Sequence, residues 1–161
     1  MRRSAFSVLL LAAACGGAAN EGSPGAGGGP TTCPIPVPVA APTFSANILP
    51  ALQQSCGSSA SSCHGTATPR GHVQYGTPSG RVELDVYNDL VNVVPSNAPT
   101  GVGWYRVKPG DVTHSWLVEK IGKDQPGGDS RYGTRMPQLN PNACQATVDT
   151  FVAWIAQGAT F

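Results

Sequence analysis

Charge is scarce in this sequence. Asp, Glu, Lys and Arg make up 12% of the 161 residues, and the formal net charge is +1. Lys and Arg do not cluster in any stretch, so the electrostatic footprint of a nucleic-acid-binding protein is missing. We therefore expect the chain to bind neither nucleic acid nor another polyanion.

Long apolar runs and hydrolase motifs are missing as well. The apolar run from Ala5 to Ala14 has about half of the roughly 20 residues that span a bilayer, and no later stretch is longer. The chain contains no Gly-x-Ser-x-Gly nucleophile elbow and no His-Glu-x-x-His zinc helix. Neither a permanent transmembrane helix nor an enzymatic activity is predicted.

The first residues have the pattern of an export signal. Two arginines precede the apolar run, which ends in small residues. The stretch LLLAAAC, followed by two glycines, resembles a bacterial lipoprotein signal, in which the cysteine becomes the lipidated first residue. We expect residues 1–14 to be a signal peptide and Cys15 to anchor the chain on the periplasmic side of a bacterial membrane, the outer in preference to the inner. The alternative is an ordinary secretory signal that is cleaved nearby.

The residues after the signal predict a tether followed by one domain. Residues 15–42 are rich in Gly, Ala, Ser and Pro, a composition that cannot bury enough apolar surface to offset its ordering entropy. Within them, Cys33 to Pro42 alternates proline with apolar residues and is typical of an extended polyproline II chain. We expect a flexible tether over residues 15–42 and a folded domain over residues 43–161.

The domain is predicted to be all-α. Apolar residues recur at helical spacing in four segments, namely 45–54, 85–93, 111–121 and 140–158. The last is the clearest, because Asn140 can cap it, Pro141 suits its first position and Gly158 suits its end. Long polar loops join the segments, and a few short helices form a poor core unaided. A buried prosthetic group would supply the missing apolar mass.

The cysteines indicate an oxidising compartment. Five cysteines in an exported chain favour covalent cross-links. If Cys15 carries lipid, then Cys33, Cys56, Cys63 and Cys144 remain. This even set allows three pairings, between which the spacing does not decide.

One stretch, SCGSSASSCHG, contains half of a haem-attachment motif. Cys63 and His64 match the second half of Cys-x-x-Cys-His. The first half departs from the motif, because Ala60 stands where the other cysteine belongs and the nearest upstream cysteine is Cys56. Covalent haem needs thiols that reach its vinyl groups and a histidine nitrogen that ligates the iron. Cys63 and His64 satisfy the essential part of that requirement.

A second haem ligand can be found near the C-terminus. Met136, in the stretch GTRMPQ, is the sole methionine left once the signal is removed. It stands in a loop bounded by glycine and proline rather than within a helical pattern. A thioether sulfur is a known axial ligand of cytochrome haem, so Met136 is a candidate for this role.

The chain resembles a class I c-type cytochrome domain, as found in exported bacterial cytochrome c-like lipoproteins. The resemblance covers roughly residues 43–161 and rests on FSANILPALQQSC…SCHG (44–65), YNDLVNV (87–93), VKPGDVTHSWLVEKI (107–121), RMP (135–137) and VDTFVAWIAQGA (148–159).

This resemblance implies a small bundle of short helices and long loops around one covalent haem c. His64 and Met136 would be the axial ligands of the iron, and Cys63 together with Cys56 would attach the ring. The implied function is electron transfer, without catalysis, to a redox partner protein that is bound transiently.

The Cys-x6-Cys-His spacing leaves three outcomes open. Cys56 and Cys63 both bind haem, Cys63 binds it alone, or the two form a disulfide and no haem is attached. Cys33 and Cys144 then remain as a pair that ties the proline-rich segment to the last helix. The alternative function is a haem-free, disulfide-stabilised cytochrome-like lipoprotein with a structural or binding role.

Overall fold

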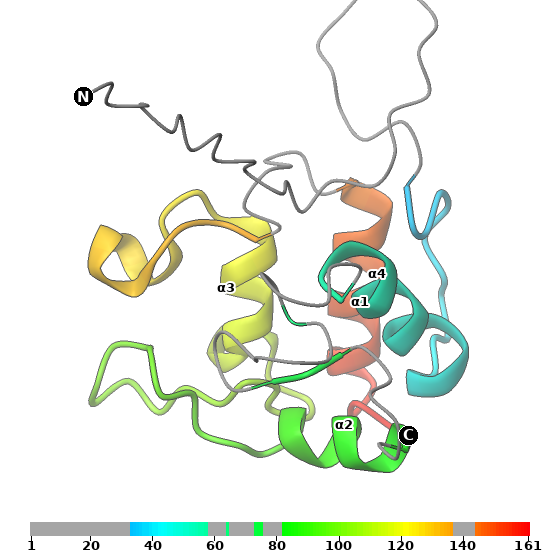
Figure 1. Cartoon of the computed structure of the whole chain (residues 1–161), viewed down its shortest axis with the longest axis horizontal. Helices are drawn as coiled ribbons and strands as arrows, with labels where there is room; N and C mark the ends of the chain where they lie inside the picture. The colour runs from blue at the N-terminus through cyan, green and yellow to red at the C-terminus, as the bar shows by residue number, and fades with distance from the viewer. Residues whose placement is uncertain (1–32, 58–63, 65–72, 76–81, 137–143) are drawn as a thin grey trace, which may run out of the picture.

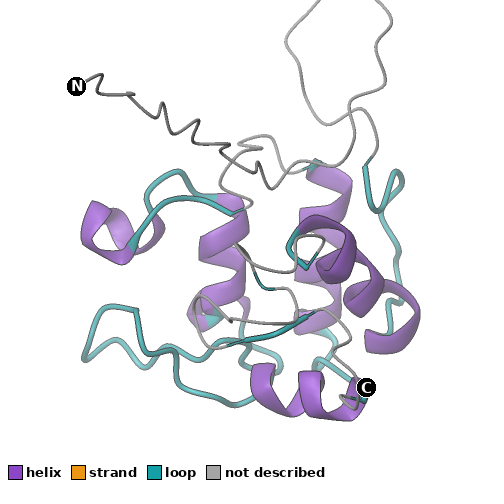
Figure 2. Ribbon diagram, in the orientation of Figure 1, coloured by secondary structure: helices purple, strands orange, loops and turns teal. Residues whose placement is uncertain are grey.

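The described part of the chain is helical. The computed structural model describes residues 33–57, 64, 73–75, 82–136 and 144–161. The α-helices in these ranges are α1 (Leu49–Ser55), α2 (Glu83–Leu90), α3 (Trp116–Gly122) and α4 (Gln145–Ala156) (Figures 1 and 2). These residues contain two isolated β-bridges and no β-strand, so the all-α prediction is confirmed.

Short irregular turns complete the architecture. A π-helical turn, η1 (Phe44–Ile48), leads directly into α1, and the 3₁₀ turns η2 (Val112–His114), η3 (Pro126–Gly128) and η4 (Ser130–Tyr132) flank α3. The hydroxyl of Thr43 caps η1 by accepting from the amide of Ala46 at 3.4 Å. Pro50 stands in the first turn of α1, where its missing N–H leaves no hydrogen bond unmade.

The two middle helices differ from their predicted bounds. α2 begins at Glu83 and ends at Leu90 rather than spanning 85–93, and Asn92 follows it with φ of 59°, a conformation that asparagine tolerates better than most residues. The segment predicted as one helix over 111–121 is divided at Ser115. The backbone of Ser115 is extended. The Ser115 hydroxyl donates to the carbonyl oxygen of Asp111 and accepts from the amide of Lys108.

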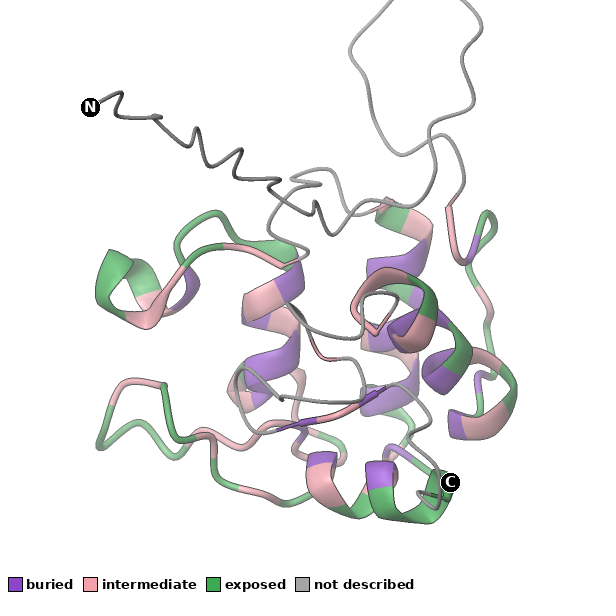
Figure 3. Ribbon diagram, in the orientation of Figure 1, coloured by how far each residue is buried: buried purple, intermediate pink, exposed green. Residues whose placement is uncertain are grey.

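The last helix forms the centre of the domain. Gly158, with φ of +98°, follows its end as predicted, because glycine adopts this left-handed conformation without strain. The predicted start at Asn140 and Pro141 lies outside the described residues. Trp154 and Ile155 are fully buried, and α4 contacts both α3 and η1 (Figures 1 and 3).

Aromatic side chains join the first and last helical segments. The ring of Phe44 lies 5.8 Å from that of Trp154 and 5.3 Å from that of Tyr87 on α2. The Tyr87 hydroxyl donates to the carbonyl oxygen of Ala159 at 2.8 Å. One aromatic group therefore joins η1, α2 and α4.

The proline-rich segment over residues 33–42 packs against the domain predicted over residues 43–161. Cys33 forms a disulfide with Cys144 at the start of α4, and Ile35 is 7% exposed within the hydrophobic core. The amide of Val39 donates to the hydroxyl of Thr150 on α4 at 3.1 Å. Residues 33–42 pack because Ile35 and Val39 lie against the core, whereas Val37 between them is 69% exposed.

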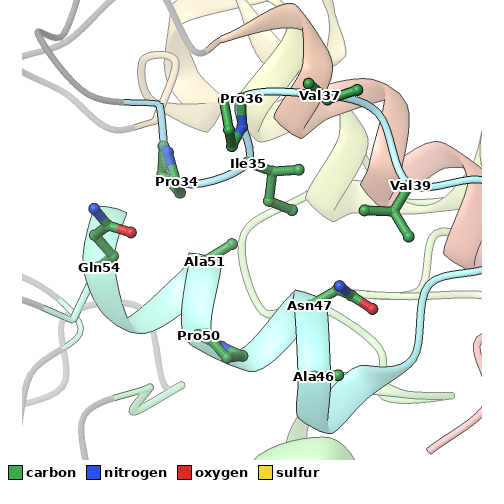
Figure 4. Close-up of a pocket in the computed structure, with 10 residues that line it drawn as sticks. All are labelled: Pro34, Ile35, Pro36, Val37, Val39, Ala46, Asn47, Pro50, Ala51 and Gln54. Carbon is green, nitrogen blue, oxygen red and sulfur yellow. The ribbon is translucent and has the colours of Figure 1, made fainter.

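A shallow groove separates this segment from the first helix. It has a volume of about 280 Å³ and runs between residues 34–39 and the η1–α1 helical segment (Figure 4). Apolar and proline side chains form most of its walls, with Asn47 and Gln54 as the amide-bearing members.

Candidate functional site

The backbone brings His64 against the end of α1. The amide of His64 donates to the carbonyl oxygen of Cys56 at 3.0 Å. In an α-helix this bond joins residues four apart, which is also the separation of the first cysteine and the histidine in Cys-x-x-Cys-His. The structure therefore places Cys56 and His64 as one helical turn would, although eight positions separate them in the sequence.

The imidazole ring of His64 is fixed by its own hydrogen bond. Its Nδ1 lies 2.8 Å from the carbonyl oxygen of Val73. A carbonyl oxygen can only accept, so Nδ1 carries the proton and the neutral ring presents its lone pair on Nε2. The amide of Tyr75 donates to the carbonyl oxygen of His64 at 2.9 Å. This bond joins the backbone at His64 to the segment 73–75.

The surroundings of this ring favour its neutral form. Burial lowers the pKa of His64, the positive charges of Lys120 and Arg106 lower it further, and the hydrogen bond to Val73 opposes them. The ring of Tyr75, which is 5% exposed, lies 4.8 Å from the imidazole and shields one side of it. Neutral imidazole is the form that binds a metal ion.

The cysteines of the motif differ in what the structure shows. Cys56 carries a free thiol, and burial raises its pKa to about 12. Cys56 therefore forms no disulfide in this structure. Cys63 lies outside the described residues. Cys15, the predicted lipidation site, lies outside them too.

Met136 is half-buried in the loop that follows η4. Its amide donates to the carbonyl oxygen of Lys120, in the last turn of α3, at 2.6 Å. The positive charge of the same Lys120 acts on the His64 ring. The C-terminal end of α3 thus binds the backbone of Met136 and also contributes a charge that acts on His64.

Four residues of this region were not predicted as functional. Val73, Tyr75 and Lys120 contact or influence His64 through main-chain atoms, a ring face and a charge respectively. The fourth is Trp104, whose buried indole Nε1 has no hydrogen-bond partner among the described residues. The sequence signal that could have drawn attention to Lys120 is its place in the S-x-L-x-x-K pattern of the middle helix.

Comparisons with known proteins add no relatives. Neither a protein-family model, nor a curated protein, nor a solved structure matches this chain. The described residues contain no cluster of three or more His, Cys, Asp or Glu side chains that could hold a metal ion. None of their helices has the length and apolar character needed to cross a membrane.

Proposed function

We propose that this chain is an exported, lipid-anchored cytochrome c-like protein that binds one haem covalently and transfers electrons. The observation that carries the proposal is the setting of His64. Its amide is joined to Cys56, its Nδ1–H is bound to Val73, and its Nε2 keeps the lone pair. Metal-bound histidines are commonly oriented by such a hydrogen bond from the other ring nitrogen to a main-chain carbonyl.

The proposal needs few ligands from the described residues. A porphyrin supplies four equatorial nitrogens, so the protein needs to supply only axial ligands, and a cluster of acidic or cysteine ligands is not required. The buried Nε1 donor of Trp104 lacks an acceptor, and a buried donor without a partner is costly. The Trp104 ring packs against Trp116 at the start of α3 and against His114, and a haem carboxylate would be an acceptor of suitable chemistry for its indole N–H.

Each residue has a distinct role in this proposal. The side chains of His64 and Met136 would hold the haem iron, and Cys63 together with Cys56 would attach the porphyrin. Val73 orients the imidazole, and Tyr75 excludes water from one of its faces. When bound, haem supplies one-electron exchange between ferrous and ferric iron.

The arrangement of helices supports a cytochrome c-like fold. The order is a first helix that ends at Ser55, directly before Cys56, then the middle helix α3, a methionine loop and a last helix that contacts both η1 and α3. The electron would pass to a partner protein through a small, transient interface. Lipid at Cys15 would keep the protein on the periplasmic side of the membrane.

A haem-free structural role is the second candidate. It is favoured by the Cys33–Cys144 disulfide and by a core that side chains alone make continuous, including Ile48, Leu52 and Trp154. In that case the scaffold would be stabilised by cross-linking rather than by a prosthetic group.

Expression of the full chain in a bacterium that has haem-attachment machinery separates the two candidates. We expect the purified, denatured protein to show a c-type pyridine haemochrome spectrum and a mass increased by one haem. A His64→Ala variant should lose the native low-spin spectrum, whereas His114→Ala, which alters a half-exposed histidine bound to Asp111, should retain it. A colourless protein with no mass increase refutes the electron carrier.

A further inference from the structure

The loop that carries Met136 is fastened to α3 by the side chain of Lys120. The ammonium Nζ of Lys120 donates to the carbonyl oxygens of Tyr132, at 3.2 Å, and Thr134, at 2.9 Å. The carbonyl oxygen of the same lysine accepts from the amide of Met136 at 2.6 Å. One residue therefore holds the loop on both sides of Gly133.

The end of the helix makes this attachment favourable. The last carbonyl groups of an α-helix lack partners within the helix, and α3 ends at Gly122. Met136 satisfies the carbonyl of Lys120, and the Nε of Arg135 satisfies that of Ile121 at 2.9 Å. The loop thus serves as the C-terminal cap of α3, and its backbone is positioned by the helix.

Gly133 shows how closely the lysine approaches the loop. Its φ is +84°, and a Cβ atom there would lie 3.2 Å from the Nζ of Lys120. A larger residue would strain the backbone and displace the ammonium group. The loop therefore depends on glycine at the point where the lysine crosses it.

Lys120 also acts on His64 through its charge. Its side chain is half-buried, and burial lowers its pKa. Because it keeps a positive charge, it is one of the groups that disfavour protonation of His64. The same cation would disfavour the additional positive charge of ferric iron relative to ferrous iron nearby.

We propose that Lys120 is a positioning residue that clamps the Met136 loop, so that the methionine thioether would be held for the haem iron, and that its charge would raise the reduction potential of a bound haem. This inference rests on the proposed haem function. Lys120 contacts main-chain oxygens of the loop and no reacting atom, so its effect is exerted through Met136.

The test uses the haem-loaded full chain and measures two quantities. The first is the charge-transfer band of methionine-ligated ferric haem, and the second is the reduction potential. In Lys120→Leu we expect the methionine-ligated fraction to fall about tenfold, since two hydrogen bonds from a charged group are lost, and the potential to fall with it. Lys120→Arg, which keeps the charge and the donors, should restore both in large part.

Lys123→Leu is the matched control. Lys123 stands three residues later, is 62% exposed and pairs with Glu119, so this variant removes the same charge without touching the loop. Gly133→Ala is the complementary variant, because it keeps the charge and disturbs the clamp. Gly133→Ala should weaken the methionine band. Because the charge of Lys120 is kept, the reduction potential should fall only as far as loss of the sulfur ligand lowers it.

The outcomes distinguish this inference from the proposed function. A wild-type protein without haem would refute both. A haem-loaded wild type whose methionine band is unchanged in Lys120→Leu and Gly133→Ala would refute the clamp alone. Equal changes in Lys120→Leu and Lys123→Leu would also refute it, because a general effect of charge would then suffice.

Discussion

The amide of His64 donates a hydrogen bond to the carbonyl oxygen of Cys56 at 3.0 Å, although eight positions separate the two residues. A single helical turn makes the same bond between residues four apart. The extra residues in the motif therefore need not move Cys56 away from the histidine. This relationship keeps the Cys56 backbone beside the histidine and gives Cys56 a testable chemical state.

The Cys56 thiol is predicted to be unreactive in the folded, haem-free protein. Burial raises its pKa to about 12, and the thiolate is the form that reacts with alkylating reagents. In a Cys15→Ser/Cys63→Ser background, we expect iodoacetamide to label Cys56 at pH 8 at least about tenfold more slowly in the native than in the denatured protein. The rate is measured by intact mass over time.

The same labelling reports on haem attachment. In the haem-loaded wild type, Cys56 should stay unlabelled even after denaturation if it forms a thioether. Labelling of denatured, haem-loaded protein at Cys56 would show that Cys63 is the single attachment point. Rapid labelling of the native haem-free protein would contradict the raised pKa of the Cys56 thiol.

The Cys33–Cys144 disulfide is predicted to stabilise the domain substantially. It closes a loop with a sequence separation of 111, and on the chain-entropy model such a cross-link is worth about 2–5 kcal/mol. Cys33→Ser/Cys144→Ser should lower the free energy of unfolding by that amount in urea denaturation. The proline-rich segment should also become more susceptible to proteolysis, because its hydrogen bonds and the packing of Ile35 then hold it without a covalent link.

Reduction of the wild type supplies the matching control. A dithiol reductant should shift the urea midpoint of the wild type towards that of the double variant and leave the double variant unchanged. A wild type that is insensitive to reductant under denaturing conditions would contradict the disulfide.

The buried hydroxyl of Thr150 is predicted to hold the proline-rich segment on α4. It accepts from the amide of Val39 at 3.1 Å and donates to the carbonyl oxygen of Ala146 at 2.8 Å. Thr150→Val keeps the shape and removes the acceptor, leaving the Val39 amide unpaired at a cost of about 1–3 kcal/mol. Thr150→Ser keeps the hydroxyl, and it should lose less stability in the same thermal or urea measurement.

Asp111 is predicted to make the stability of the domain sensitive to acid. Hydrogen bonds from Lys108, Thr113 and His114 hold the pKa of this carboxyl well below its usual range. Because the folded state binds the proton more weakly than the unfolded state, the contribution is fully present above about pH 4 and is lost as the pH falls further. Asp111→Asn should therefore flatten the loss of stability on acidification.

The experiment compares urea midpoints between about pH 5 and pH 2. Asp149→Asn, which changes an exposed carboxylate on α4, is the control for net charge. Asp149→Asn should leave the loss of stability at low pH unchanged. If it reduced that loss as much as Asp111→Asn does, the hydrogen bonds of Asp111 would not be the cause of the acid sensitivity.

Local patterns predicted the helices well where local interactions decide them. The apolar stripe of α4 and the stop at Gly158 depend on spacing and on one glycine, so both could be recognised from the sequence. The break at Ser115 could not, because it depends on a hydrogen bond from the amide of Lys108. The packing of Ile35 likewise depends on α4, which lies more than a hundred positions away.

The sequence by itself determined the chemical types in the candidate site: the thiols, the imidazole of His64 and the thioether of Met136. Only the tertiary structure decided which atoms orient them. The carbonyl of Val73, the ring of Tyr75 and the clamp of Lys120 act through main-chain groups, a ring face and a half-buried charge. Long-range packing determines these partners. Every residue has a carbonyl group, so the sequence does not show which carbonyl lies close enough to His64 to accept its hydrogen bond.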